Sequence, residues 1–290
     1  MSSTFVSPQA RSTPGTAAAL RQFDQISFQW VMQIIAWLGL LMLTAPTLIV
    51  LLASFSSSAA LQFPPPGFSL QWYLTLFSFP ELRAAALNSF QVALITAIVC
   101  VVLGVAACLA MIGSRARWVT VMDALVMSPL ALPGVALGLG MMSFFAMMGV
   151  RLSLFTLIVG HIVICTPYVV RNVLASLTQL GSSLQEASMA LGANPVYTFF
   201  KVTLPLIKPG VLIGAFMAFL TSFDNVAVTL FLSDARTEML PIRMWSMIEN
   251  DLDVRAAAIS GVLIFFTALL MIAMERVSGL SKALISDRPH

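Results

Sequence analysis

Six long runs of apolar residues constrain the fold of this chain more than any other feature of its sequence. Each run has roughly 20 residues or more, the length at which an α-helix crosses about 30 Å of hydrocarbon. The runs are continuous, whereas the strands of a transmembrane barrel alternate in short segments. The sequence therefore predicts an all-α, polytopic membrane protein with six transmembrane helices. We expect them at Trp30–Phe55, Ala84–Ile112, Val119–Met148, Leu152–Ala175, Pro209–Leu230 and Ala256–Met274.

The composition supports this class and argues against an enzyme. Only 9% of the residues are charged and 59% are hydrophobic, whereas about a quarter of the residues of a soluble domain are charged. Cys100, Cys108 and Cys165 lie inside the apolar runs and are expected to pack there. His161 is expected to be structural because no acidic residue lies near it, and it shares no metal-ligand spacing with His290. We therefore expect no catalytic residue, no metal and no cofactor.

The positive charges predict the orientation in the membrane. Six spans place both termini on one side. The two tails, the second loop, and the end of the fourth run with the loop after it hold ten of the fifteen Lys and Arg residues. Because Lys and Arg collect on the cytoplasmic side, both termini are expected there. We expect a flexible cytoplasmic tail at 1–29, a transmembrane domain at 30–275 and a cytoplasmic tail at 276–290. The net charge of +3 includes no basic cluster among aromatics, so nucleic acid is not an expected partner.

Two further features concern the third and fourth runs. Asp123, near the cytoplasmic end of the third run, is expected to pair with Arg115 or Arg117. Prolines in a span remove backbone donors and can kink the helix. Kinks are therefore expected at Pro129, Pro133 and Pro167, with shape as their simplest role.

The loop at 183–210 carries the signals of two short helices. Ser183 and Glu186 have the spacing of a capping box, which starts a helix. Gly192 adopts a left-handed conformation at little cost and is expected to end that helix. The start signal at Ser183 and the stop signal at Gly192 lie close together, so the first helix is expected to be short.

A second short helix is expected to follow at once. Asn194 is a suitable N-cap, Pro195 fits the first helical position, and Leu204-Pro205 is expected to end the helix. Two short helices at an angle form a rigid cytoplasmic projection. Its apolar side chains suit either the groove of a partner protein or, with Tyr197 and Lys201, the surface of the bilayer.

The same loop matches a known pattern of Glu-Ala-Ala, a Gly six residues after the Glu, and then an aliphatic residue and Leu-Pro. This chain supplies Glu186, Ala187, Ser188, Gly192, Val202, Leu204 and Pro205 at those spacings. The loop thus resembles the EAA loop of binding-protein-dependent ABC importer permeases, with Ser188 in place of the second Ala as a mild departure. Asn88-Ser89 and the prolines of the third run are also similar to this family.

The resemblance implies a type I ABC importer permease fold in the bacterial inner membrane. It implies a dimer of cytoplasmic ATP-binding subunits, a second permease subunit, homologous or identical, and an extracytoplasmic solute-binding protein as partners, besides membrane lipid. The sequence contains no G-x-x-x-x-G-K-[ST] phosphate loop, so ATP hydrolysis is expected in a partner. Contact with the ATPase is implied for Glu186, Ala187, Ser188, Leu191, Gly192 and Ala193.

An ionisable residue inside the fifth run marks a candidate translocation path. Asp224 lies in a group of polar residues at 221–225. A charged side chain within a span is costly and is by default a functional hypothesis, so Asp224, Asn225 and Ser222 are expected to line the path. The alternative is that Ser222, Asn225 or the backbone holds Asp224, which then only fixes helix packing.

Three segments bear on the cargo. They are Phe63–Ser69 with Trp72-Tyr73, Phe223–Asn225, and Leu240-Pro241. They resemble the subgroup of permeases that import spermidine and putrescine, which implies a small, amine-bearing solute. The alternatives are another small charged nutrient and, in a different class, a stand-alone secondary transporter, which typically shows inverted repeats with paired broken helices.

Overall fold

The computed structural model describes residues 15–112, 114, 116–180, 183–234 and 236–278, with side chains from Phe28 to Arg276 except Phe77. Helices make up most of these ranges. They are α1 (Gly15–Ser54), α2 (Gln71–Thr75), η1 (Leu76–Ser78), α3 (Pro80–Met111), α4 (Arg117–Ala131), α5 (Gly134–Met147), α6 (Leu154–Leu180), α7 (Ser183–Ala190), α8 (Pro195–Thr198), η2 (Phe199–Thr203), α9 (Leu204–Phe223), α10 (Thr229–Leu232), α11 (Leu240–Asp251) and α12 (Val254–Ser278).

The chain forms two compact units, residues 1–52 and 53–290. The first unit contains α1 up to Leu52. The apolar part of this helix, Phe28–Ser54, has 27 residues and a mean hydropathy of 2.3. The helix begins at Gly15, so the part of the expected tail at 15–29 is helical, and residues 1–14 lie outside the described chain. At the other terminus α12 continues to Ser278, beyond the expected end of the last span.

Five described helices are long and apolar enough to cross a membrane, and α4 with α5 makes a sixth only if this bent pair is one span. The chain bends by 109° between the two helices, so the third run, expected as a span with proline kinks at Val119–Met148, is divided into two helices. Leu132 has φ −95° and ψ 142°, the extended backbone that a residue before proline prefers. Pro133 lacks an N–H and cannot continue the helical hydrogen bonds. The expected kink is therefore a complete break.

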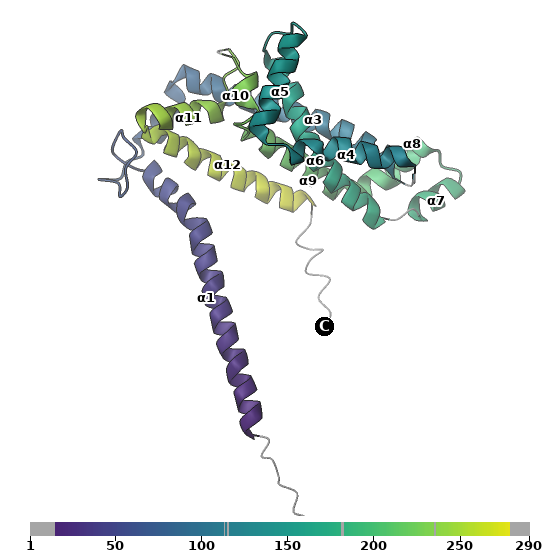
Figure 1. Cartoon of the computed structure of the whole chain (residues 1–290), viewed down its shortest axis with the longest axis horizontal. Coiled ribbons are helices and arrows are strands. Elements are labelled where there is room, and N and C mark those ends of the chain that lie inside the picture. The colour runs from purple at the N-terminus through teal and green to yellow at the C-terminus, as the bar shows by residue number, and fades with distance from the viewer. Residues whose placement is uncertain (1–14, 113, 115, 181–182, 235, 279–290) are drawn as a thin grey trace, which may run out of the picture. The chain divides into compact units, whose positions relative to one another are not determined.

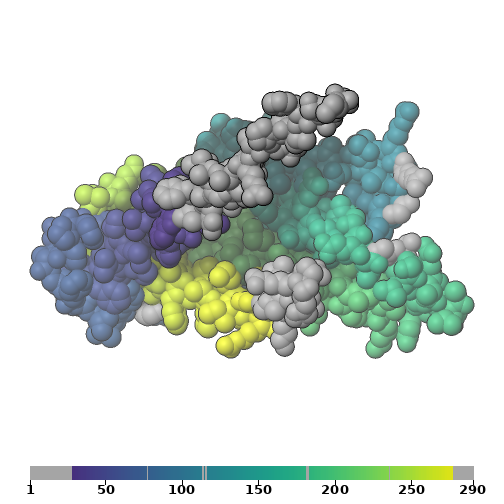
Figure 2. Space-filling view, turned by 90° about the horizontal axis from the view of Figure 1, so that it is seen from below, coloured from purple at the N-terminus to yellow at the C-terminus, as the bar shows by residue number. Residues whose placement is uncertain are grey.

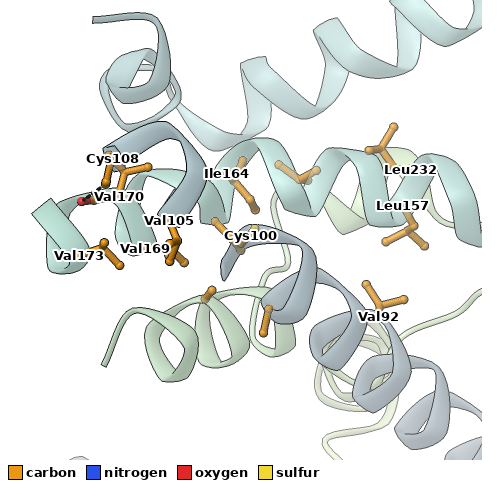
Figure 3. Packing of buried hydrophobic residues seen from close by; sticks show 14 of the residues in the cluster. Val92, Cys100, Val105, Cys108, Leu157, Ile164, Val169, Val170, Val173 and Leu232 are labelled. Carbon is orange, nitrogen blue, oxygen red and sulfur yellow. Dashed lines mark hydrogen bonds between the residues drawn. The ribbon is translucent and has the colours of Figure 1, made fainter. Parts of the chain in front are cut away.

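The core of the second unit is formed by α3, α6 and α9, which pack against one another more extensively than the other helices. Figure 3 shows Cys108 of α3 beside Val170 of α6, and Val105 of α3 beside Val169. The three cysteines are buried and free, as expected of small packing residues.

Glycines allow these three helices to approach closely. A Cβ at Gly104 of α3 would lie 2.7 Å from Val169 Cγ1, and one at Gly214 of α9 would lie 3.0 Å from Val169 Cα. Small residues at such contacts are the usual means of packing helices in membranes. Val169 of α6 therefore occupies the space that the two glycines leave.

The helix that follows the predicted loop differs from the expectation. Residues Pro195–Phe223 form one helix of 29 residues, so the prediction that Leu204-Pro205 ends the second short helix is wrong. The π-helix η2 explains why, because the Leu204 N–H donates to the Phe199 carbonyl, five residues earlier. The wider π-turn gives room for the Pro205 ring, which would clash with a carbonyl in a regular α-helix.

The second unit has two distinct ends. Figure 1 shows α7 and α8 at one end and α11 at the other, with α3, α6 and α9 between them. In the space-filling view, the green surface of α7 and α8 projects at its end of the molecule (Figure 2). A sequence of alternating spans and loops thus produces two separated surfaces, one at each end of the helical core.

Candidate functional site

The first candidate site is the segment Ser183–Thr203, which we call the helical hairpin. Its first helix, α7, ends as the sequence predicts, because Gly192 has φ +88°. The Gly192 N–H donates to the Met189 carbonyl at 2.9 Å and the Ala193 N–H donates to the Ser188 carbonyl at 3.2 Å. This pair of bonds is the Schellman motif that ends helices at glycine. Ser183 is the first helical residue, and the residue before it lies outside the described chain.

The second helix of the hairpin starts at the predicted residue. Asn194 has extended backbone, and its Oδ1 accepts the Tyr197 N–H at 2.7 Å. Pro195 occupies the first turn, where its missing N–H costs nothing. Only three residues, Leu191, Gly192 and Ala193, therefore separate the end of the first helix from the cap of the second, and the angle between the helices is fixed locally.

Hydrogen bonds between side chains join the two helices of the hairpin. The hydroxyls of Ser188 and Thr198 are 2.9 Å apart, and Gln185 Nε2 donates to Thr203 Oγ1 at 3.2 Å. Thr198 and Thr203 are buried. Ser188, the departure from the Glu-Ala-Ala pattern, therefore links the two helices of the hairpin through its hydroxyl. Gln185, Thr198 and Thr203 could not be identified from the sequence, since polar residues in a loop are usual.

The outer face of the hairpin is apolar. Leu191 is 90% exposed and Val196 is 67% exposed, and Glu186, Ala187 and Gly192 are also exposed. Further exposed apolar residues are Leu184, Met189, Tyr197 and Phe200. A rigid projection with exposed apolar side chains can bind a groove on another protein. Of the residues predicted to make that contact, Ser188 and Ala193 are only partly exposed.

The second candidate site is the end of α9. The helix stops at Phe223, earlier than the predicted Leu230, and Asp224 is its C-cap with φ −96° and ψ 4°. Asn225 Oδ1 then accepts the Val228 N–H at 2.8 Å, an Asx-type bond that favours a turn over a helix. Residues 224–228, the break, therefore separate α9 from α10. Asp224 lies at the end of a helix and not within it.

Asp224 faces a groove between α9 and α12 of about 760 Å³. Thr221, Asn225 and Thr267 supply its other polar groups, and it is otherwise lined mainly by apolar and aromatic side chains. The rings of Phe219 and Phe223 stack at 5.9 Å between centroids. An exposed carboxylate beside aromatic rings can accept an ammonium group, with the rings covering an attached hydrocarbon chain.

Ser222 does not lie in this groove. It is buried, and its Oγ lies 2.8 Å from Nδ1 of His161 on α6. The other ring nitrogen of His161, Nε2, lies 3.1 Å from Thr229 Oγ1 on α10. His161 is thus a buried, hydrogen-bonded residue, in agreement with the structural role expected from the sequence. Of the three residues predicted to line the translocation path, Asp224 and Asn225 line this groove and Ser222 does not.

The short helix α10 fits against glycines of two other helices. A Cβ at Gly138 of α5 would lie 2.8 Å from a Phe231 ring atom and 3.0 Å from the Ala227 carbonyl oxygen. A Cβ at Gly160 of α6 would overlap Leu232 Cδ1. The break and α10 are therefore held by close packing against α5 and α6.

Asn88-Ser89 fastens the segment before α11. Ser89 Oγ accepts the Leu240 N–H at 2.8 Å, and Asn88 Nδ2 donates to the Glu238 carbonyl at 3.1 Å. In the same segment the Thr237 hydroxyl donates to Asp234, and this hydrogen bond lowers the pKa of the carboxyl below its ordinary value. These residues build the end of the unit that is opposite the hairpin.

Asp123 pairs with a residue that the sequence did not suggest. Its Oδ2 lies 3.9 Å from Arg171 NH2 on α6, whereas Arg117 was expected and Arg115 lies outside the described chain. Arg171 is exposed and Asp123 is partly exposed, and the atoms are 3.9 Å apart, so the pair adds little stability. Among the described residues, no group of three or more His, Cys, Asp or Glu side chains could hold a metal ion.

Comparisons with known proteins agree with these features. Residues 100–280 match the family described as "Binding-protein-dependent transport system inner membrane component". The chain is 27% identical over 212 residues to the spermidine/putrescine transport system permease protein PotC of Haemophilus influenzae, covering 73% of this chain and 82% of that protein. It is 29% identical over 222 residues to the putrescine transport system permease protein PotI of Escherichia coli, covering 74% and 79%. It is also 28% identical over 217 residues to the molybdenum transport system permease protein ModB of Mycobacterium bovis, covering 70% and 82%.

Solved structures show the same fold. A bacterial ABC transporter involved in the import of alginate matches with a TM-score of 0.67 and 13% identity, covering 91% of this chain and 99% of that one. The MetNI methionine ABC transporter, in an inward-facing conformation, matches with a TM-score of 0.59 and 21% identity, covering 69% and 95%. The family match over residues 100–280 sets aside the stand-alone secondary transporter. The chain belongs to the inner membrane components of binding-protein-dependent transport systems, and it is a multi-pass ABC importer permease with the type I fold and not an enzyme.

Proposed function

We propose that this permease carries a small, amine-bearing cation of the polyamine class through the groove that Asp224 faces. One observation carries the proposal, namely an exposed carboxylate at the end of a membrane helix, in a groove lined by aromatic rings. A carboxylate in a membrane-spanning segment is tolerated when it faces water or an oppositely charged partner. An ammonium group is such a partner, and the names of PotC and PotI state a matching cargo for two relatives.

The driving energy is proposed to enter through the helical hairpin. Its exposed apolar face, which includes Leu191 and Val196, suits a cleft on a cytoplasmic ATP-binding subunit. A dimer of such subunits would bind this permease and a second permease subunit, homologous or identical. A solute-binding protein would deliver cargo at the opposite end, near α11.

Loss of the gene is expected to remove the uptake of a diamine. Cells without the chain should take up radiolabelled putrescine at least about tenfold more slowly at micromolar concentration, since most cargo then lacks a path of high affinity. Restoring the chain should restore uptake, and excess spermidine should compete. Unchanged putrescine uptake with a loss of molybdate uptake would contradict the cargo and favour another small charged nutrient, as the name of ModB suggests.

The orientation is a separate proposal, with both termini and the hairpin in the cytoplasm and the segment before α2 outside. The distribution of Lys and Arg supports it. Ser57 and Ser183 are exposed positions on the two proposed sides, and the native cysteines are buried. An impermeant thiol reagent applied to intact cells is expected to label Ser57→Cys and not Ser183→Cys. Equal labelling of the two from outside would refute this orientation.

A further inference from the structure

We propose that His161 is a positioning residue, which fixes both flanks of the break and so aims Asp224 into the groove. The inference rests on the proposed function of Asp224. His161 belongs to α6 and does not reach the groove itself, because its side chain is fully buried. It acts through Ser222 at the end of α9 and Thr229 at the start of α10.

The hydrogen bonds around the ring determine its tautomer. Thr229 Oγ1 donates its proton to the Asn225 carbonyl. A hydroxyl has one proton, so Thr229 must accept from His161 Nε2–H. The neutral ring then has a lone pair on Nδ1, which accepts the proton of Ser222 Oγ 2.8 Å away. Ser222, His161, Thr229 and the Asn225 carbonyl therefore form one directed chain without a buried charge.

The residues in this chain of hydrogen bonds lie on both sides of Asp224 in the sequence. Ser222 lies two residues before Asp224, and Thr229 lies four residues after Asn225. The Asp224 N–H donates to the Leu220 carbonyl at 3.0 Å, as the cap of α9, whereas residues 225–228 lie outside helices. Helical hydrogen bonds therefore hold Asp224 from the α9 side only. Because α6 is part of the rigid core, one imidazole ring ties both flanks to a fixed frame. Leucine would fill much of the same space without either bond.

The test is a double-mutant cycle with uptake measured per assembled complex. His161→Leu is expected to raise the putrescine concentration for half-maximal uptake about tenfold, a value within the range of coupled residues. In the Asp224→Asn background the same change should have no further effect. The control Thr156→Val removes another buried hydroxyl from α6, whose bonds are to Ser153. It is expected to lower thermal stability and leave that concentration unchanged.

The other possible outcomes separate a failure of the role of His161 from a failure of the role proposed for Asp224. If the effects of His161→Leu and Asp224→Asn simply multiply, His161 does not act through Asp224 and the inference is wrong. If His161→Leu fails to assemble, Ser222→Ala removes one of the two bonds and should show the same coupling with a smaller shift. If Asp224→Asn alone changes nothing, the proposed function fails. The inference is then decided by the rate at which a cationic thiol reagent labels Asp224→Cys, which His161→Leu should change severalfold and Thr156→Val should not.

Discussion

Replacing Gly192 with valine is expected to leave the permease inserted and assembled but to abolish the stimulation of ATP hydrolysis by cargo. Gly192 has φ +88°, a conformation that costs an L-residue roughly 1–2 kcal/mol and a β-branched residue more. A Cβ at this position would meet nothing within 4 Å. The expected damage is therefore not a clash, but a change of backbone that alters the angle between α7 and α8.

The hairpin has little means of absorbing this change. Only Ala193 stands between Gly192 and the Asn194 cap, and the bond between Ser188 and Thr198 ties the helices together. A permease with a tilted hairpin can still bind its ATPase without transmitting closure. The measurement is ATP hydrolysis by the purified complex, with and without cargo-loaded binding protein.

A matched control separates the backbone effect from the added side chain. Ala190→Val places the same side chain at an exposed helical position two residues earlier, where φ is ordinary. It is expected to keep most of the stimulation, whereas Gly192→Ala should fall between the two. Full stimulation of an assembled Gly192→Val complex would show that the left-handed cap is not needed for coupling.

The sequence predicted the parts of the fold that local chemistry decides. The apolar runs gave the spans, because a helix in lipid must be long and apolar over its length. The turn of the hairpin could be predicted from Gly192, Asn194 and Pro195, because a positive φ, a side-chain cap and a missing N–H each act within a few residues. The same local reasoning expected His161 to be structural.

The sequence could not predict features that depend on packing. Pro133 indicated a kink, but a bend of 109° depends on the helices that receive α5, such as α10 beside Gly138. Leu204-Pro205 looked like a helix end because the π-turn before it has no sequence signal. Ser222 and Asp224 are both polar and close in sequence, and only the partner of Ser222 on α6 shows that the two residues face different surroundings.

Asp224→Asn is the second change with a large expected effect. Asparagine keeps the shape of the side chain and removes its negative charge. A cation that enters the groove must give up part of its hydration, and Asp224 offsets that cost with a charge that asparagine lacks. Asp224 is exposed and makes no ion pair among the described residues, so assembly with the ATPase should be unaffected.

The most direct test of this account is putrescine uptake per assembled complex, with Asp123→Asn as the control. Asp123 is also a partly exposed carboxylate on a helix of the membrane domain. It pairs with Arg171, and neither residue lines the groove. We expect Asp224→Asn to reduce uptake about tenfold or more while ATP hydrolysis still responds to the loaded binding protein, and Asp123→Asn to transport normally. Normal uptake by assembled Asp224→Asn, or a loss only in proportion to the amount of protein, would contradict the proposal that Asp224 lines the path of a cationic cargo.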